Sequence, residues 1–142
     1  MNRKKRVLVF GTFDLLHRGH LFYLEQARKK GKELIVIVAR NNTVKKVKGN
    51  LPVMDEKDRL HLIKSLKVVD KAILGCKGNM YKIIKELKPD TICLGYDQKP
   101  GVEKLKKELL KLGLKPKIYK IKCFKPHKLK SRKIKEKIRN SK

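Results

Sequence analysis

Tryptophan is absent from this 142-residue sequence, and aromatic residues of all kinds make up only 6% of it. Proteins that bind single-stranded nucleic acid without sequence preference stack bases on aromatic side chains, so such a platform is poorly supplied here. Long apolar runs are also lacking, and no stretch approaches the roughly 20 residues that span a bilayer. The basic start, residues 1–6, leads into an apolar run that is too short for the core of a signal peptide. We therefore expect a cytoplasmic protein with no membrane partner.

Cysteine is scarce as well. The three cysteines, Cys76, Cys93 and Cys123, are odd in number and widely spaced, and no CxxC pair occurs. This pattern resembles neither a disulfide framework nor a zinc site. Cys93 lies in an apolar run, which indicates a small core residue.

Acidic residues are the third shortage. Only 13 Asp and Glu face 40 Lys and Arg, which gives a formal net charge of +27. Such an excess is typical of proteins that bind nucleic acid. Lysine is spread along the whole chain instead of forming one stripe, and aromatic residues are few. We therefore expect no specific nucleic-acid partner, only nonspecific binding at low salt, and a nucleic-acid-binding module is the least favoured alternative.

The hydrophobic pattern alternates between short apolar runs and longer stretches with helical spacing. Strands are predicted at residues 7–10, 34–39, 69–74, 91–94 and 117–121. Helices are predicted at residues 20–30, 56–66, 81–87, 103–112 and 131–139, with Asp55 and Ser131 as N-caps. Residues 41–52 are predicted to form a loop.

Strict alternation of strands and helices indicates parallel strands, because parallel neighbours need a crossover between them. A chain of 142 residues fits one domain and is too short for two. We therefore predict a single α/β domain over residues 1–142, a Rossmann-like doubly wound fold with a five-stranded parallel sheet and the basic helix 131–139 as part of it.

The segment GTFDLLHRGH follows the first predicted strand and leads into the first helix. In doubly wound folds, ligands bind at the carboxyl ends of strands, where the N-termini of helices point outward. Gly11 and Thr12 allow the backbone to approach a phosphate. His17 and His20 are three residues apart, so both rings can lie on one side of the helix start. Gly19, between them in the sequence, leaves room for a ligand against the backbone. Two imidazoles at a helix N-terminus suit phosphoryl transfer.

Two other interpretations of the histidine pair stay open at this point. The histidines could be surface residues, or they could be metal ligands on a helix. Metal-binding pairs prefer the i, i+4 spacing of HExxH, and no third ligand lies near in the sequence. The position directly after the first strand favours a ligand-binding role.

These residues resemble the signature of the cytidylyltransferase-like branch of the HxGH nucleotidyltransferases. The resemblance continues through VARNNTVKKVKG (residues 38–49), Arg59, LKVVDKAILG (residues 66–75) and LGYDQ (residues 94–98). Together these segments are most similar to the archaeal FAD synthases, which join ATP and FMN to give FAD and pyrophosphate. The nearest alternative family is glycerol-3-phosphate cytidylyltransferase, which uses CTP and shares the first motif.

The resemblance implies roles for the first loop. Its nucleotide-binding set here is Gly11, Thr12, Phe13, His17, Arg18, Gly19, His20, Asp97, Phe124 and Ser131. His17 and His20 are expected to stabilise the triphosphate as electrostatic groups and not as bases. Asp14 is the local candidate for holding a magnesium–phosphate assembly, with a loop-structuring role as its alternative. Arg18 stands where proline is frequent in relatives, and we expect it to point outward into solvent.

Further implied residues lie in later loops. Lys46, assigned here as catalytic, and Lys48 are expected over the substrate phosphates, although lysine is common everywhere in this chain. Arg59 is expected to contact phosphate or to brace the site. Asp97 follows the fourth strand and is expected to meet the nucleoside, with a simple acid at a helix start as the alternative.

The last segment departs most from the family. Relatives carry an RTEGISTT-like stretch, where this chain reads KPHKLKSRKI at residues 125–134. Lys125 replaces the arginine as a candidate for the substrate phosphates, and Ser131 keeps a hydroxyl at the helix start. Phe124 could stack on a substrate ring or anchor the loop in the core. The resemblance also implies a divalent cofactor, magnesium first, and a homodimer.

Overall fold

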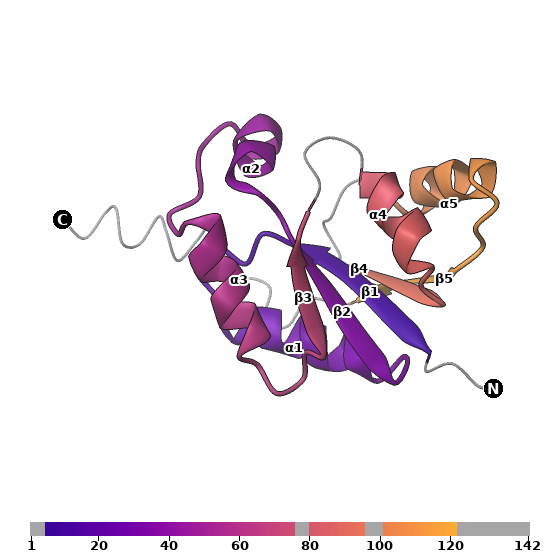
Figure 1. Ribbon diagram of the computed structural model, residues 1–142, viewed down its shortest axis with the longest axis horizontal. Coiled ribbons are helices and arrows are strands. Elements are labelled where there is room, and N and C mark those ends of the chain that lie inside the picture. Colours follow the sequence, from indigo (N-terminus) through magenta and orange to yellow (C-terminus); the bar gives the residue numbers. More distant parts are fainter. Residues whose placement is uncertain (1–4, 76–79, 96–100, 122–142) are drawn as a thin grey trace.

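The computed structural model describes residues 5–75, 80–95 and 101–121 of the chain (Figure 1). Within them, five parallel strands form one sheet in the order β3-β2-β1-β4-β5. The strands are β1 (Arg6–Gly11), β2 (Glu33–Val38), β3 (Lys71–Leu74), β4 (Thr91–Gly95) and β5 (Lys117–Ile121). The predicted five-stranded parallel sheet is confirmed.

Alternating side chains give the sheet two buried faces. In β1, Val7 and Val9 enter one apolar cluster and Leu8 enters the other. Strands buried on both faces need near-continuous apolar sequence, which is why ELIVIV in β2 contains no polar residue after Glu33. Cys93 lies in β4 with no exposed surface, and burial raises the pKa of its thiol to about 11. It is a core residue, as predicted.

Helices of the described residues cover both faces of the sheet (Figure 1). On one face lie α1 (Arg18–Arg28) and α3 (Glu56–Lys64), which contribute Leu24, Ala27 and Ile63 to the first cluster. On the other lie α4 (Met80–Leu87) and α5 (Val102–Lys111), which contribute two buried residues each to the second cluster. The fold is therefore a three-layer α/β structure with the sheet in the middle.

The predicted strands and helices within the described residues are present, with shifted ends. Helix α1 begins at Arg18, two residues before the predicted start, because His17 caps it. The predicted N-cap of α3 is confirmed, since the Asp55 carboxylate accepts the N–H of Lys57 at 3.3 Å. Strand β3 starts later than predicted because Val69 closes a turn on the carbonyl of Leu66. The predicted helix 131–139 lies outside the described residues, as do Cys76 and Cys123.

One prediction was wrong. Residues 41–52 were expected to be a loop, but α2 (Asn41–Lys48) occupies most of this stretch. The helix gave no periodic signal because it buries only Val44. Its C-terminus has the expected form, with Gly49 in the left-handed conformation at φ 85°.

The order of the strands fixes where a ligand can bind. From β1 the chain moves outward through β2 and β3 on one side, and then returns to place β4 on the other side of β1. Such a reversal opens a crevice at the carboxyl ends of the two diverging strands. The loop between β1 and α1 lies at this end of the sheet, as does α2, which begins three residues after β2.

Candidate active site

The loop after β1 holds an unusual backbone. Phe13 and Leu15 both have positive φ, at 54° and 59°, a conformation that side chains with a Cβ rarely adopt. The ring of Phe13 lies over Gly11 so closely that a Cβ at Gly11 would stand 2.5 Å from it. Glycine is therefore required at this position by the ring above it. Strain of this kind tends to collect at functional sites.

The two histidines of the motif cap α1 reciprocally. The Nδ1 atom of His17 accepts the N–H of Gly19 at 3.0 Å, and the Nδ1 atom of His20 accepts the N–H of His17 at 3.2 Å. This is the geometry of a capping box, with imidazoles in place of the usual hydroxyl and carboxylate. The rings stack with centroids 4.0 Å apart, and the ring of Phe13 meets His20 edge-on at 5.4 Å.

The capping bonds fix where each ring carries its proton. A nitrogen that accepts a hydrogen bond bears no hydrogen, so both neutral rings are protonated at Nε2. Each Nε2–H is therefore a donor that is not used in the cap. The Nε2 atom of His17 is buried and has no hydrogen-bond partner among the described residues. A buried donor without a partner is costly and indicates a ligand that accepts from it.

Electrostatics keep the pair neutral. The pKa of His20 is lowered to about 3, chiefly by burial and then by the nearby His17 and Lys48, while Asp14 opposes the shift. Burial also lowers the pKa of His17. Protonation at Nδ1 would in addition break the cap. The rings can therefore donate hydrogen bonds to phosphate oxygens without a net charge of their own.

Asp14 is buried and bonds to the loop that precedes α3. Its two carboxylate oxygens accept the N–H groups of Val53 and Met54 at 2.7 and 2.8 Å. These contacts favour the loop-structuring role over direct contact with a metal. Its role as a magnesium ligand stays a prediction.

Arg59 is fully buried beneath the site and joins three segments. Its Nη1 atom donates to the carbonyls of Thr12 and Ala39 at 2.9 and 2.6 Å, and its Nε atom donates to the carbonyl of Met54 at 3.0 Å. Burial lowers the pKa of its guanidinium, and Asp14 leads the carboxylates that oppose this shift. Of the two predicted roles, these contacts support bracing of the site.

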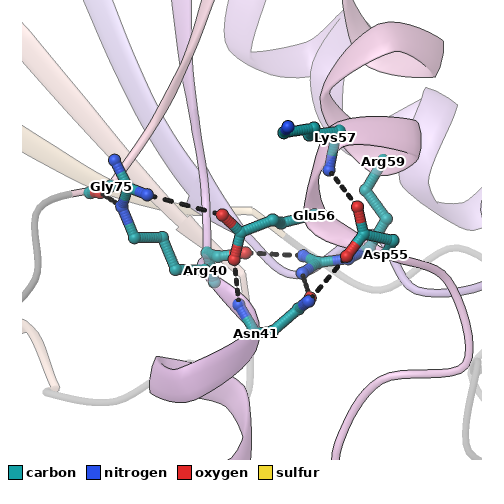
Figure 2. A network of polar contacts seen from close by, with 8 residues as sticks. Arg40, Asn41, Asp55, Glu56, Lys57, Arg59 and Gly75 are labelled. Atoms are coloured by element: carbon teal, nitrogen blue, oxygen red, sulfur yellow. Dashed lines mark hydrogen bonds and ion pairs between the residues drawn. The ribbon is translucent and has the colours of Figure 1, made fainter.

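The start of α2 is held by a polar network from α3, which Figure 2 shows. The backbone N–H of Asn41 donates to the Glu56 carboxylate at 2.9 Å, and the Asn41 amide contacts both Asp55 and Arg59. Arg40 pairs with the same Glu56 carboxylate at 3.4 Å and donates to the carbonyl of Gly75.

Two lysines of α2 were predicted over the phosphates. Lys46 and Lys48 are both exposed. The charge of Lys48 is one of the causes that lower the pKa of His20, and its place over the phosphates stays a prediction. The catalytic role assigned to Lys46 stays a prediction. Arg18 is exposed at the first position of α1, where an outward side chain was expected.

The predicted site residues and those found in the structure do not coincide fully. The predicted contacts of Asp97, Phe124, Lys125 and Ser131 lie outside the described residues. Asn41, Arg40 and Glu56 were missed by sequence reasoning, because nothing in the pattern linked residues 40–41 to residue 56.

Within the described ranges, no group of three or more His, Cys, Asp or Glu side chains is placed to hold a metal ion. Across the same residues, no helix has the length and apolar character needed to cross a membrane.

Comparison with known proteins gives a consistent result. The family described as cytidylyltransferase-like matches residues 8–137. An FAD synthase of Thermoplasma volcanium is 50% identical over 116 residues, which cover 82% of this chain and 81% of the relative. An FAD synthase of Methanobrevibacter ruminantium is 47% identical over 140 residues, covering 96% and 93% of the two chains.

Solved structures agree on the fold. A crystal structure described as the lipopolysaccharide core biosynthesis protein of Thermoplasma volcanium is 48% identical, with a TM-score of 0.83 over 86% of this chain and 99% of that chain. Thermotoga maritima TmcAL bound with alpha-thio ATP is 15% identical, with a TM-score of 0.71 over 96% of this chain and 51% of its own. The second likeness shows the fold alone.

We predict that His20 stays neutral throughout the ordinary pH range. Its pKa falls from the usual 6.5 to about 3 in the folded protein, so between these values the unfolded chain binds more protons. The free energy of unfolding should therefore decrease as the pH falls from 6.5 toward 3. In an NMR titration of the free protein, the His20 ring signals should not shift between pH 8 and 5. A midpoint near pH 6 would contradict the lowered pKa of His20.

Proposed function

The chain belongs to the cytidylyltransferase-like family, and from this premise we infer that it is an FAD synthase, which transfers AMP from ATP to FMN and releases pyrophosphate. FAD synthases that are 44–51% identical over most of the chain support this reading over a CTP-dependent one. The structural observation that carries it is the pair of capped histidines, which present Nε2–H donors where β1 ends and α1 begins.

The reaction is an in-line displacement at phosphorus. A phosphate oxygen of FMN attacks the α-phosphorus of ATP, a new P–O bond forms, and the bond to the pyrophosphate leaving group breaks. No protein nucleophile is required, because the FMN phosphate is itself the nucleophile. No general base is required either, because the phosphate dianion carries no proton to remove. What the protein must supply is alignment of two anions that repel each other.

The histidines supply stabilisation of the developing charge. Negative charge accumulates on the phosphate oxygens as the bond to pyrophosphate breaks. Two neutral N–H donors, fixed in direction by their capping bonds, stabilise that charge without reorganising during the reaction. The N-terminal end of α1 adds its partial positive charge at the same place.

We propose magnesium as the divalent cofactor. Bound to ATP, it would neutralise part of the phosphate charge. The buried Asp14 carboxylate accepts two backbone N–H groups, so the ion is expected to bind through phosphate oxygens first, with Asp14 as a candidate side chain nearby.

The remaining contacts are proposals that extend this site. We propose that Thr12, Phe13 and Asp97 contact the nucleotide and that Lys46 and Lys48 contact the phosphates. In the same scheme, Phe124, Lys125 and Ser131 are proposed to contact the substrates. We also propose a cytoplasmic location and a homodimer, in line with the family.

The substrate pair can be tested directly. We expect purified protein with magnesium and FMN to form FAD from ATP and no flavin dinucleotide from CTP, with products separated by chromatography. CTP with glycerol 3-phosphate should release no pyrophosphate above background. Pyrophosphate from that second mixture, with no FAD from the first, would reassign the protein as a cytidylyltransferase that uses the same histidines.

A substitution can separate the two roles of His17. Asparagine is among the best N-cap residues, so His17→Asn should keep an acceptor for the Gly19 N–H while it loses the Nε2–H donor. We expect folding to be retained and kcat to fall by ~10²–10³, the usual cost of losing one transition-state donor. His61→Asn, at an exposed histidine of α3, is the matched control and should turn over normally. Near-normal kcat in folded His17→Asn would remove His17 from the mechanism.

A further inference from the structure

The pairing between β1 and β4 ends before the two strands do. It stops at Val9 and Cys93, whereas β1 continues to Gly11 and β4 continues to Gly95. Over these last two residues each strand stays paired with its other neighbour, β1 with β2 and β4 with β5. The two strands therefore part from each other at the carboxyl end of the sheet, where the reversal in strand order opens the crevice for a ligand.

The hydroxyl of Tyr23 reaches this point from α1. It donates to the carbonyl of Cys93, the last residue of β4 that pairs with β1, at 2.8 Å. The side chain also packs against the apolar cluster that contains Val9 and Cys93. Burial raises the pKa of the hydroxyl well above its ordinary value, so it keeps its proton and remains a donor. Helix α1 is thus bonded to β4, the strand across the crevice from the loop that carries the histidine motif.

The histidine pair lies at the start of the helix that Tyr23 anchors. His20 and Tyr23 are three residues apart on α1, so they share one face of the helix and stand about 4.5 Å apart along its axis. His17 is the N-cap of the same helix, and its ring stacks on that of His20 with centroids 4.0 Å apart. The buried apolar residues of α1, Leu24 and Ala27, lie further along. Within less than one helical turn, the position of Tyr23 fixes that of the histidine rings.

We propose that Tyr23 is a positioning residue: by bonding α1 to β4, it fixes the histidine pair relative to the opposite wall of the crevice. The inference rests on the proposed function, because it takes the histidines as the groups that stabilise the transferred phosphate. Tyr23 itself touches no substrate in this scheme, since its hydroxyl donates to the Cys93 carbonyl. It holds the two Nε2–H donors where negative charge develops, so the loss of its bond affects the transition state.

A double-mutant cycle on kcat tests this coupling. Tyr23→Phe removes only the hydroxyl, and kcat should fall roughly tenfold, which corresponds to about 1.4 kcal/mol. In the His17→Asn background the same substitution should lower kcat by no more than about threefold, because residues that act through one another are not additive. A smaller fraction of folded enzyme would instead reduce kcat by one factor in both backgrounds. Tyr119→Phe, at the exposed tyrosine of β5, removes the same atom and is the matched control, which should leave kcat unchanged.

The histidine rings give a second readout that does not depend on turnover. In NMR spectra of the folded protein without substrates, the ring nitrogen signals of His17 and His20 should move in Tyr23→Phe and stay in place in Tyr119→Phe. Three results would overturn the proposal: a wild-type kcat in Tyr23→Phe, an equal fall in kcat in both backgrounds, or unchanged ring signals. If the wild-type protein forms no FAD, the proposed function fails, and the ring signals still decide the role of Tyr23.

Discussion

The buried guanidinium of Arg59 is the interaction on which the arrangement of this site depends. A charge without exposed surface is tolerated only when its donors are satisfied, and here they reach the backbone or side chain of three separate segments. These are the loop after β1, the turn between β2 and α2, and the loop before α3. The first leads into the histidine motif, the second leads into α2, and the third carries the amides that bond to Asp14. A hydrogen bond to a charged group typically contributes about 1.5–3 kcal/mol, so these four bonds couple the segments.

The histidine motif shows how a structural bond can serve chemistry. The acceptor nitrogens of His17 and His20 cap α1, and the Nε2–H of each ring takes no part in that cap. Burial and the neighbouring Lys48 then keep His20 uncharged, with a pKa of about 3. The spacing of three residues is thus required twice, once for the reciprocal cap and once for two parallel donors. Gly11 completes the loop by leaving space for the Phe13 ring that lies against His20.

Sequence reasoning predicted the features that local pattern encodes. Apolar runs located the five strands, helical spacing located α1, α3, α4 and α5, and the GTFDLLHRGH segment located the site at the end of β1. What it missed depends on contacts between distant residues. Helix α2 was taken for a loop because it buries only Val44, and because the carboxylate that accepts its first N–H comes from Glu56, fifteen residues later in the chain. Asn41 was overlooked for the same reason, and Arg59 had two possible roles until its carbonyl partners were known.

The most direct test of this account is hydrogen exchange in Arg59→Lys, which keeps the charge but cannot reach all four acceptors. The N–H groups of Val53 and Met54 donate to Asp14 and not to the substituted side chain, so their exchange reports on the junction itself. We predict faster exchange at these two amides while the amides of β1 and β4 keep the protection of the wild type. Unchanged exchange at Val53 and Met54 in the folded variant would contradict the claim that Arg59 holds the segments of the site together.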